Sequence, residues 1–415
     1  MQPRESELVH DWNRAGELPL PARGRVLLND ETLRDGLQSP SVRTPSIEQK
    51  VEILHGLVEL GIDALDIGLP GAGPHVARDV ERLAREIAER RLPISPNCAA
   101  RTVRADIEPI VEIAQRTGLA IEVACFLGSS PIRQYTEGWE LDRMLRLTRE
   151  AIELAVGEGL PVMYVTEDTT RAAPEDLRRL YTEAVAAGAR RVCIADTVGH
   201  ATPVGARNVT RFIRSVVDAT GVAVEVDWHG HDDRGLAVAN AIAAAEAGAD
   251  RLHGTLLGIG ERVGNTQLDQ LLVNFQLMGW IDRPLDRLGA LCAEVAATTG
   301  IPIPDNYPIV GRDAFRTQTG IHAAAILKAK AKGDDWLADR IYSGIPAAMI
   351  GRRQEVEVGP MSGQANVVYW LTERGLSAPP DLVQAIFRRA KSATEVLSEA
   401  EIVELCRLHS KAGSP

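Results

Sequence analysis

The sequence predicts an α/β protein: a (β/α)₈ TIM barrel over residues 25–282, followed by a smaller, mainly helical C-terminal region. Short apolar runs alternate with longer Ala-, Leu- and Glu-rich stretches of helical periodicity. Eight strand candidates alternating with helices over roughly 250 residues are typical of such a barrel. Glycines such as Gly61 and Gly118 close helical stretches just before the next strand, where a left-handed helix cap favours Gly.

The strand candidates follow one another at the spacing of β/α units. They are RVLLND (25–30), IDALDIG (62–68), LPISPN (92–97), LAIEVACF (119–126), LPVMYVT (160–166), RRVCIAD (190–196), VAVEVDW (222–228) and DRLHGTL (250–256). A doubly wound parallel sheet is the alternative for the same alternation. No GxGxxG pattern follows the first strand, and this favours the barrel.

The pattern changes after residue 282. Residues 300–313 are Pro-rich and predict a linker, and the chain beyond them is mainly helical with one extended stretch, QEVEVGP. We therefore expect an N-terminal arm or extra helix (1–24), the barrel (25–282) and helical subdomains (283–415).

Composition limits the classes of function. The formal net charge is −11, from 46 basic and 57 acidic residues, which argues against a nucleic-acid or membrane-surface binder. Five scattered cysteines without a CxxC pair predict buried, reduced thiols. We find neither a leader-type apolar segment nor a membrane-spanning one, so we expect a cytoplasmic protein.

The stretch VDWHGHDDRG (226–235) follows the seventh strand candidate. His229 and His231 are two residues apart and would face the same side of a strand. Asp35, after the first strand, lies close to them in a closed ring of eight strands. Two imidazoles and a carboxylate suit a divalent metal, with Mg²⁺, Mn²⁺, Zn²⁺ and Co²⁺ all possible. A lone HxH is a weak signal, because a histidine often merely packs.

Polar clusters also follow the first, fifth, sixth and eighth strands, at the end where barrels carry their active sites. They include Arg34 and Gln38 in DETLRDGLQSP, Glu167 in TEDTTR, Thr197 in ADTVGHATP and Asn265 in GTLLGIGERVGN. Taken singly, each could be a solvated loop, with an internal Arg–Asp pair in the first and ordinary mobility in the last. Their common position after the strands favours a catalytic site.

Together these motifs closely resemble the DRE-TIM metallolyase superfamily, and within it the 2-isopropylmalate, homocitrate and citramalate synthases. The resemblance covers roughly residues 25–365. ETLRDGLQSP, HGHDDRGLAVANA and GIGERVGN match the motifs of the barrel, and TQTGIHAAAILK matches the segment after it. The likeness is greatest to 2-isopropylmalate synthases without their C-terminal regulatory domain, so we expect no amino-acid feedback through such a domain.

The resemblance implies a role for each matching residue. Asp35, His229 and His231 would bind the metal, with Asn265 near it. Arg34 would stabilise the developing oxyanion, Gln38 and Thr197 would contact the substrate carboxylate, and Glu167 would belong to the catalytic network. His322 would act in proton transfer at the acetyl-CoA methyl group, and Tyr342 would be a catalytic tyrosine. The region after the barrel would reach the barrel mouth of a second subunit, which implies a homodimer with shared active sites.

The implied reaction is a condensation of acetyl-CoA with a 2-oxo acid, in which a base acts on the methyl group and the metal polarises the oxo carbonyl. We expect 2-oxoisovalerate as the acid and pyruvate as the next candidate. Met163 stands where homocitrate synthases carry an arginine, which argues against 2-oxoglutarate.

Two positions depart from the synthase pattern. Arg133 stands where isopropylmalate synthases have a histidine, so it is either a surface residue or a contact for an extra anionic group, as in phosphonopyruvate or oxaloacetate. Leu37 stands where the synthases usually have Glu, and RDGLQ is the form found in hydroxymethylglutaryl-CoA lyase. A lyase or aldolase is the competing reaction class, and His322 argues against it. A non-catalytic barrel is disfavoured by the intact ligand set.

Overall fold

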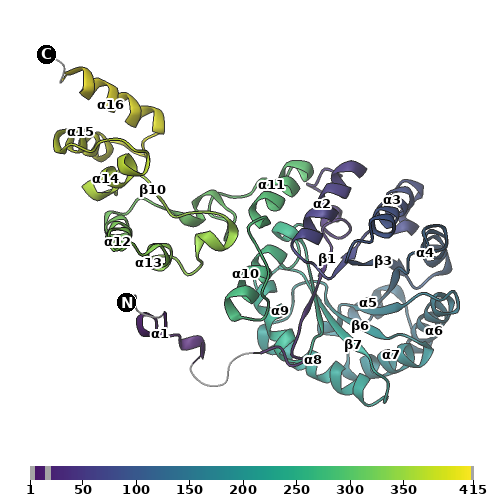
Figure 1. Cartoon of the computed structure of the whole chain (residues 1–415). Helices are drawn as coiled ribbons and strands as arrows, with labels where there is room; N and C mark the ends of the chain where they lie inside the picture. Colours follow the sequence, from purple (N-terminus) through teal and green to yellow (C-terminus); the bar gives the residue numbers. More distant parts are fainter. Residues whose placement is uncertain (1–4, 15–19, 413–415) are drawn as a thin grey trace. The chain divides into compact units, whose positions relative to one another are not determined.

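The barrel is a closed ring of eight parallel strands. In the computed structural model, which describes residues 5–14 and 20–412, the strands are hydrogen-bonded in the order β1 to β8, and β8 pairs with β1 (Figure 1). Their bounds are β1 (Leu27–Asp30), β2 (Ala64–Asp66), β3 (Ser95–Arg101), β4 (Glu122–Gly128), β5 (Val162–Glu167), β6 (Arg191–Asp196), β7 (Glu225–Gly230) and β8 (Arg251–Gly254). The predicted TIM barrel is confirmed.

Helices surround this ring on the outside (Figure 1). They are α2 (Ile47–Glu59), α3 (Pro74–Arg90), α4 (Arg104–Thr117), α5 (Pro131–Glu137), α6 (Leu141–Gly157), α7 (Pro174–Ala187), α8 (Pro203–Asp218), α9 (Ala237–Glu246) and α10 (Leu268–Met278). α2 begins with a capping box, in which the Ser46 hydroxyl accepts from the Gln49 N–H and the Gln49 side chain accepts from the Ser46 N–H. α8 is amphipathic and buries Ile213, Val216 and Val217 on one face.

Several strands end later than the sequence indicates. The strand candidates LPVMYVT and VAVEVDW stop at Thr166 and Trp228, whereas β5 runs to Glu167 and β7 runs to Gly230, beyond His229. Ladder hydrogen bonds to neighbouring strands extend these elements past the last apolar residue, as in the pairing of Gly128 with Glu167. As a result Glu167 and His229 stand on rigid strands rather than on loops.

The inside of the barrel holds buried charges that are paired with one another. Asp227 of β7 accepts from Arg251 Nε at 2.6 Å and from Arg191 Nη1 at 2.8 Å, and Arg251 Nη2 also reaches Glu122 Oε2 at 2.7 Å. Arg191 pairs with Glu225 as well. Burial alone would raise the pKa of Asp227, but the charges of Arg191 and Arg251 lower it well below its ordinary value. Asp227 is therefore ionised inside the barrel.

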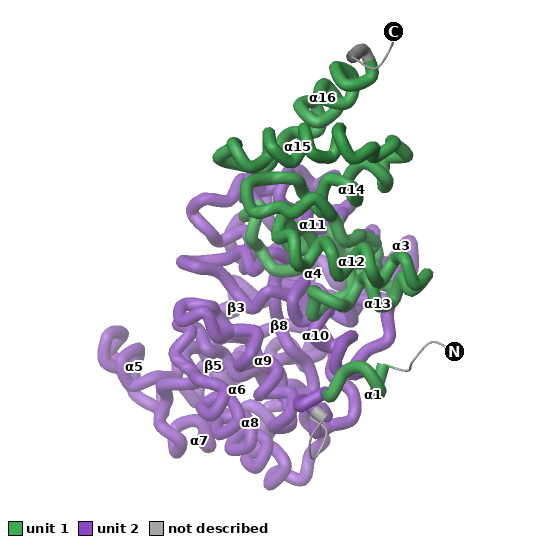
Figure 2. Tube along the Cα trace, turned by 90° about the vertical axis from the view of Figure 1, so that its left-hand side faces the viewer, with its two compact units in different colours: residues 1–10, 284–289, 303–415 green, residues 11–283, 290–302 purple. Residues whose placement is uncertain are grey.

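The chain divides into two compact units, coloured separately in Figure 2. One contains residues 11–283 and 290–302 and includes the barrel; the other contains residues 1–10, 284–289 and 303–415. Outside the barrel the helices and strands are α1 (Glu5–Leu8), α11 (Leu288–Thr299), β9 (Arg316–Thr317), α12 (Gly320–Ala331), α13 (Asp335–Arg340), β10 (Glu355–Val356), α14 (Gln364–Glu373), α15 (Pro380–Lys391) and α16 (Glu399–Ala412).

The C-terminal unit has apolar cores of its own. One core gathers residues of α14, α15 and α16, among them Trp370, Leu371, Ile386 and Ile402. The expected extended stretch is β10, which pairs in parallel with β9. β9 has only two residues, too few for a period-two pattern, so the sequence gives no signal for it.

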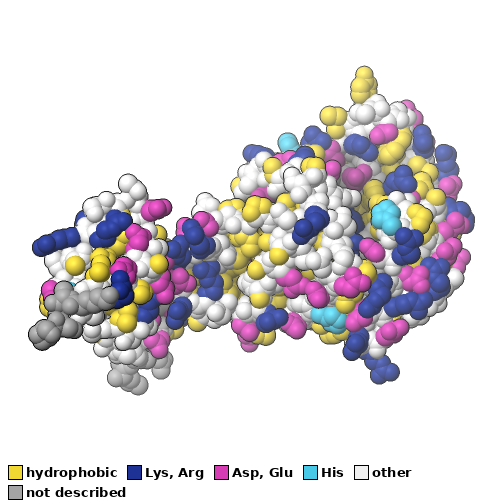
Figure 3. All heavy atoms as spheres, turned by 90° about the horizontal axis from the view of Figure 1, so that it is seen from above, with side chains coloured by type: hydrophobic (Ala, Val, Ile, Leu, Met, Phe, Trp, Pro, Cys, Tyr) yellow, Lys and Arg dark blue, Asp and Glu magenta, His cyan; other side chains and the backbone are white. Residues whose placement is uncertain are grey.

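Cysteine burial and surface charge agree with the composition. Four of the five cysteines are buried and Cys406 is partly buried, and all are free thiols, as predicted. On the face shown in Figure 3, basic and acidic side chains are intermingled. Within the described residues, every helix is too short or too polar to cross a membrane.

Candidate functional site

A pocket of about 290 Å³ opens among the residues at the carboxyl ends of the barrel strands. It is lined by Glu31, Arg34, Asp35, Gln38, Asp66, Leu69, Ala99, Ala124, Phe126, Met163, Val165, Glu167, Cys193, Ala195, Thr197, His229, His231, His253, Glu261 and Arg262. Seven residues predicted from the sequence therefore meet in one cavity: Arg34, Asp35, Gln38, Glu167, Thr197, His229 and His231.

Asp35, His229 and His231 form a buried cluster whose ligand atoms all lie within 4.8 Å of one another. His229 Nε2 is 3.7 Å from Asp35 Oδ2, and the two imidazole centroids are 5.1 Å apart. Both histidines project to the same side because Gly230 alone separates them on the strand. Two nitrogens and a carboxylate oxygen on one side of a pocket are a donor set for a divalent cation.

Two orphaned polar atoms test whether a cation fits here. His231 Nδ1 and Asn265 Oδ1 are buried, and the described residues offer neither of them a hydrogen-bond partner. Asn265 Nδ2 donates to the Ile259 carbonyl at 3.1 Å, which fixes Oδ1 on the other side of the amide. A backbone bridge joins His231 to Asn265. Unpaired acceptors beside this cluster fit a bound cation.

The charge states of the cluster also fit. Burial, together with the neighbouring His229, lowers the pKa of His231 to about 4, so its imidazole is neutral near pH 7. Burial alone would raise the pKa of Asp35, but the charges of Arg34 and His229 lower it below its ordinary value. A neutral imidazole and an ionised carboxylate are the forms that ligate metals.

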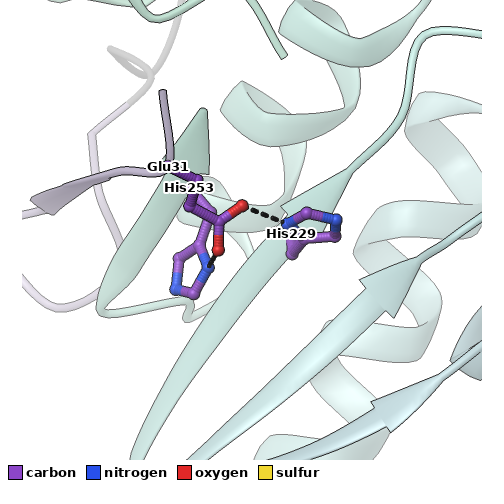
Figure 4. A group of neighbouring side chains, drawn as sticks. All are labelled: Glu31, His229 and His253. Atoms are coloured by element: carbon purple, nitrogen blue, oxygen red, sulfur yellow. Dashed lines mark hydrogen bonds and ion pairs between the residues drawn. The ribbon is translucent and has the colours of Figure 1, made fainter. Parts of the chain in front are cut away.

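A second cluster, of Glu31, His229 and His253, shares His229 with the first (Figure 4). Glu31 Oε2 is 2.7 Å from His229 Nδ1, and Glu31 Oε1 is 2.9 Å from His253 Nδ1. These atoms already satisfy one another, whereas the cluster of Asp35 contains an orphaned atom. The cluster of Asp35 is therefore the candidate metal site, and Glu31 supports it from behind.

Arg34 is held by three carboxylates. Its Nε, Nη1 and Nη2 donate to Asp66 Oδ2 at 2.7 Å, Asp35 Oδ2 at 2.9 Å and Glu31 Oε1 at 3.2 Å. Burial raises the pKa of Asp66 to about 6 although Arg34 opposes this. The remaining N–H groups of the guanidinium are available for a substrate oxygen in the pocket.

Thr197 lies at the other side of the pocket, and its hydroxyl has a defined direction. Asp168 N–H donates to Thr197 Oγ1 at 2.8 Å, so the hydroxyl hydrogen is directed to another acceptor. Asp168 has a positive φ of 59° and is clamped by Arg171 through two contacts of 2.7 Å. Thr197 can thus donate to an anionic group in the pocket.

The Gly-rich loop after β8 is compact rather than mobile. Gly264 has φ 97°, and a Cβ there would lie 1.7 Å from the Gly258 carbonyl oxygen. Arg262 donates to Asp233 at 2.8 and 3.0 Å and to the Thr197 carbonyl at 2.6 Å. The loop therefore fastens the loops after β6 and β7 to one another beside the candidate metal site.

The pocket lining does not include four of the predicted residues: Asn265, Arg133, His322 and Tyr342. Arg133, on α5, has a half-buried side chain whose Nε is buried, and the described residues provide no partner for it. His322 and Tyr342 belong to the C-terminal unit, where their rings stack 3.9 Å apart and His322 Nδ1 lies 3.3 Å from the Thr317 hydroxyl.

The pKa of Glu167 is shifted by its surroundings in the pocket. Burial raises its pKa, against the opposing charges of Arg133 and Arg34. A carboxyl group whose proton is held more tightly than in water can donate a hydrogen bond or exchange a proton.

Sequence reasoning found Glu167 but missed His253. The only signal for His253 was a titratable residue within an apolar strand, two positions after Arg251.

Comparison with known proteins gives consistent matches. A family model described as HMGL-like matches residues 25–295. Over 400 residues the chain is 35% identical to a homocitrate synthase of Methanopyrus kandleri, covering 94% of this chain and 91% of that protein. It is 31% identical over 379 residues to a 2-isopropylmalate synthase of Pyrococcus abyssi, covering 89% and 74%.

Among solved structures, a hydroxymethylglutaryl-CoA lyase of Pseudomonas aeruginosa is similar, with a TM-score of 0.55 and 20% identity. The match covers 68% of this chain and 94% of that one. At this identity the likeness concerns the fold of the barrel.

The candidate metal site predicts that His231→Ala removes tight binding of Mn²⁺ or Co²⁺, because it deletes one of the two nitrogen donors. Calorimetric titration of the full chain, or the visible spectrum of bound Co²⁺, measures this. His200→Ala is the matched control, since His200 is an exposed histidine in the adjacent loop. Equal affinity of the two variants for the metal would contradict the assignment.

Proposed function

Because the chain belongs to the HMGL-like family, we propose that it catalyses the metal-dependent condensation of acetyl-CoA with a 2-oxo acid. The proposed acid is 2-oxoisovalerate, which would give 2-isopropylmalate and CoA. The supporting observation is a single pocket that joins the Asp35–His229–His231 cluster to an apolar wall. Both the homocitrate and the 2-isopropylmalate synthase relatives fit this reaction class, so the side chain of the acid is decided by the pocket.

The apolar wall supports a branched aliphatic side chain. It is formed by side chains that project from β3 to β6 into the pocket: Ala99, Ala124, Met163, Val165, Cys193 and Ala195. Arg251 Nη2 touches Met163 Sδ at 3.3 Å, but its charge is neutralised by Asp227 and Glu122. The distal carboxylate of 2-oxoglutarate would meet this wall without a free cation. Pyruvate, which would give citramalate, would leave much of the wall unfilled.

The residues of the barrel have complementary roles in the proposed reaction. Arg34 would donate to the oxo oxygen as negative charge develops there, and Thr197 and Gln38 would hold the carboxylate. A divalent cation held by Asp35, His229 and His231 beside Asn265 would supply Lewis-acid polarisation of the oxo carbonyl. Mg²⁺, Mn²⁺, Zn²⁺ and Co²⁺ all accept this donor set. Glu167 would complete the polar network around the oxo acid.

The carbon–carbon bond requires removal of a proton from the acetyl methyl group; the resemblance implies His322 for this step and makes Tyr342 a second catalytic residue. Their stacked rings offer a base and a hydroxyl at one place. The carbanion carbon bonds to the oxo carbon, the oxo oxygen takes a proton, and water cleaves the thioester to release CoA. We propose that the C-terminal region brings these residues to the barrel of a second copy, so that a homodimer shares its sites.

Arg133 favours a second candidate substrate. Its buried Nε lacks a partner in the described part of the chain, and its charge acts on Glu167 in the pocket. An oxo acid with an extra anionic group, of the phosphonopyruvate or oxaloacetate type, would give this Nε a partner. The lyase reaction is less favoured, because cleavage would leave His322 without its role.

The substrate proposal predicts release of free thiol from acetyl-CoA with 2-oxoisovalerate, less with pyruvate, and none in the presence of EDTA. Oxaloacetate, 2-oxoglutarate and phosphonopyruvate complete the panel, and Arg133→Ala is assayed beside the unchanged chain. A preference for an anionic acid that Arg133→Ala abolishes would select the second candidate. Cleavage of a hydroxy acid without acetyl-CoA would select the lyase.

Thr197→Val is expected to raise the KM for the oxo acid roughly tenfold to a hundredfold, the usual loss for one hydrogen bond to a charged group. Steady-state kinetics with saturating acetyl-CoA measures it. Thr197→Ser is the control, because serine retains both the acceptor for Asp168 N–H and the hydroxyl hydrogen. Equal KM values for the two variants would show that the hydroxyl does not bind the acid.

Shared sites predict complementation between two inactive variants. His231→Ala lacks a metal ligand and His322→Ala lacks the proposed base, but a mixed dimer would contain one intact site. Random exchange of subunits should restore about a quarter of the original activity. The measurement is thiol release after the two proteins are mixed, and no recovery despite verified subunit exchange would refute sharing.

A further inference from the structure

A continuous row of acidic and basic side chains crosses the barrel interior behind the candidate metal site. Starting from the site, His229 Nδ1 contacts Glu31 Oε2 at 2.7 Å, and His253 Nδ1 contacts Glu31 Oε1 at 2.9 Å (Figure 4). His253 Nε2 then contacts Asp227 Oδ2 at 2.8 Å. Both ring nitrogens of His253 therefore face carboxylate oxygens.

From this row we propose that His253, held in place by Asp227, is a positioning residue that acts through Glu31 on the metal ligand His229. The inference rests on the metal site of the proposed function and adds residues behind it. Asp227 lies on β7 and His253 on β8, and Glu31 directly follows β1; these three strands are neighbours in the ring.

The first step concerns the proton on His229. A carboxylate can only accept, so its contact with Nδ1 requires that Nδ1 carry the hydrogen. The lone pair of the neutral ring is then on Nε2, the nitrogen that faces Asp35 at 3.7 Å. Partners of this kind fix the tautomer and the orientation of a ligating histidine. Glu31 thus prepares His229 for the cation.

The second step concerns what holds Glu31. Its carboxylate is buried, and Arg34 Nη2 donates to Oε1 at 3.2 Å, a longer contact than that of His253 with the same oxygen. Without His253, Arg34 would be the only cation on that side and could draw the carboxylate away from His229. Together the two imidazoles hold the Glu31 carboxylate so that one of its oxygens faces His229 and the other faces His253.

The third step concerns what holds His253. The Asp227 side chain is fully buried and is fixed by Arg251 Nε at 2.6 Å and Arg191 Nη1 at 2.8 Å. β7 and β8 are in register at Asp227 and Arg251, so each strand carries a charged residue and, two positions later, a histidine on the same side. The row is thus built into the strand register.

Two substitutions separate the two contacts of His253. If asparagine replaces His253, its amide nitrogen lies near the former position of Nδ1 and can still donate to Glu31. If glutamine replaces His253, its amide nitrogen lies near the former position of Nε2 and can donate only to Asp227. His253→Gln should weaken Mn²⁺ binding to the full chain about tenfold to a hundredfold, the usual effect of losing such a support. His253→Asn should bind Mn²⁺ nearly as well as the unchanged protein.

His55→Gln is the matched control, because His55 also contacts a carboxylate, Glu86 at 2.9 Å, but on the outer helices α2 and α3. If the unchanged protein fails to bind Mn²⁺, the proposed metal site itself is wrong. If it binds and His253→Gln binds equally well, the positioning role is wrong. Equal weakening by Asn and Gln would also overturn it, because the direction of the donor would then be irrelevant.

A measurement on the unchanged protein avoids any folding defect of the variants. Nitrogen-15 NMR of histidine-labelled, metal-free protein reports which ring nitrogens carry hydrogen. We expect hydrogen on Nδ1 of both His229 and His253. Hydrogen on Nε2 of His229, or a bare Nδ1 on His253, would overturn the inference.

Discussion

Asp227 and Glu31 are buried carboxylates inside a closed barrel, and their pairing with buried cations is the interaction on which this site depends. Removing one partner from a buried pair costs about 3–5 kcal/mol, because the other charge is left alone. Asp227 and Glu31 meet this requirement with Arg191, Arg251, His253 and Arg34. The strand register must therefore bring each charge opposite its partner.

This pairing divides the pocket into two chemically different regions. Around Asp35, His229 and His231 the pocket is charged, and hydrogen bonds from Arg34 to Asp35 and between Glu31 and His229 direct these side chains. The rest of the lining includes the apolar wall from Ala99 to Ala195. The first region suits the reacting carbonyl and carboxylate of an oxo acid, and the second suits the part of the acid that only needs to fit.

The alternation of strands and helices, together with a few polar residues at the strand ends, was enough to predict the barrel and most of the pocket. Asp35, His229 and His231 could be placed together because strand position determines the side to which a side chain points. His253 could not be assigned, since its role depends on two carboxylates from other strands. Ser130 and Pro131 mark the start of α5, but the approach of Arg133 to Glu167 depends on the pairing of β4 with β5, which local sequence does not determine.

The two regions of the pocket also differ in how they can change during evolution. Within the charged row, replacing one residue leaves the charge of its partner unpaired. A viable evolutionary path therefore requires compensating substitutions on two or more strands, which is a strong form of epistasis. Replacements in the apolar wall have no fixed partners and can accumulate one at a time. Selection can therefore reshape the preference for the acid in small steps while the metal-facing chemistry stays constant.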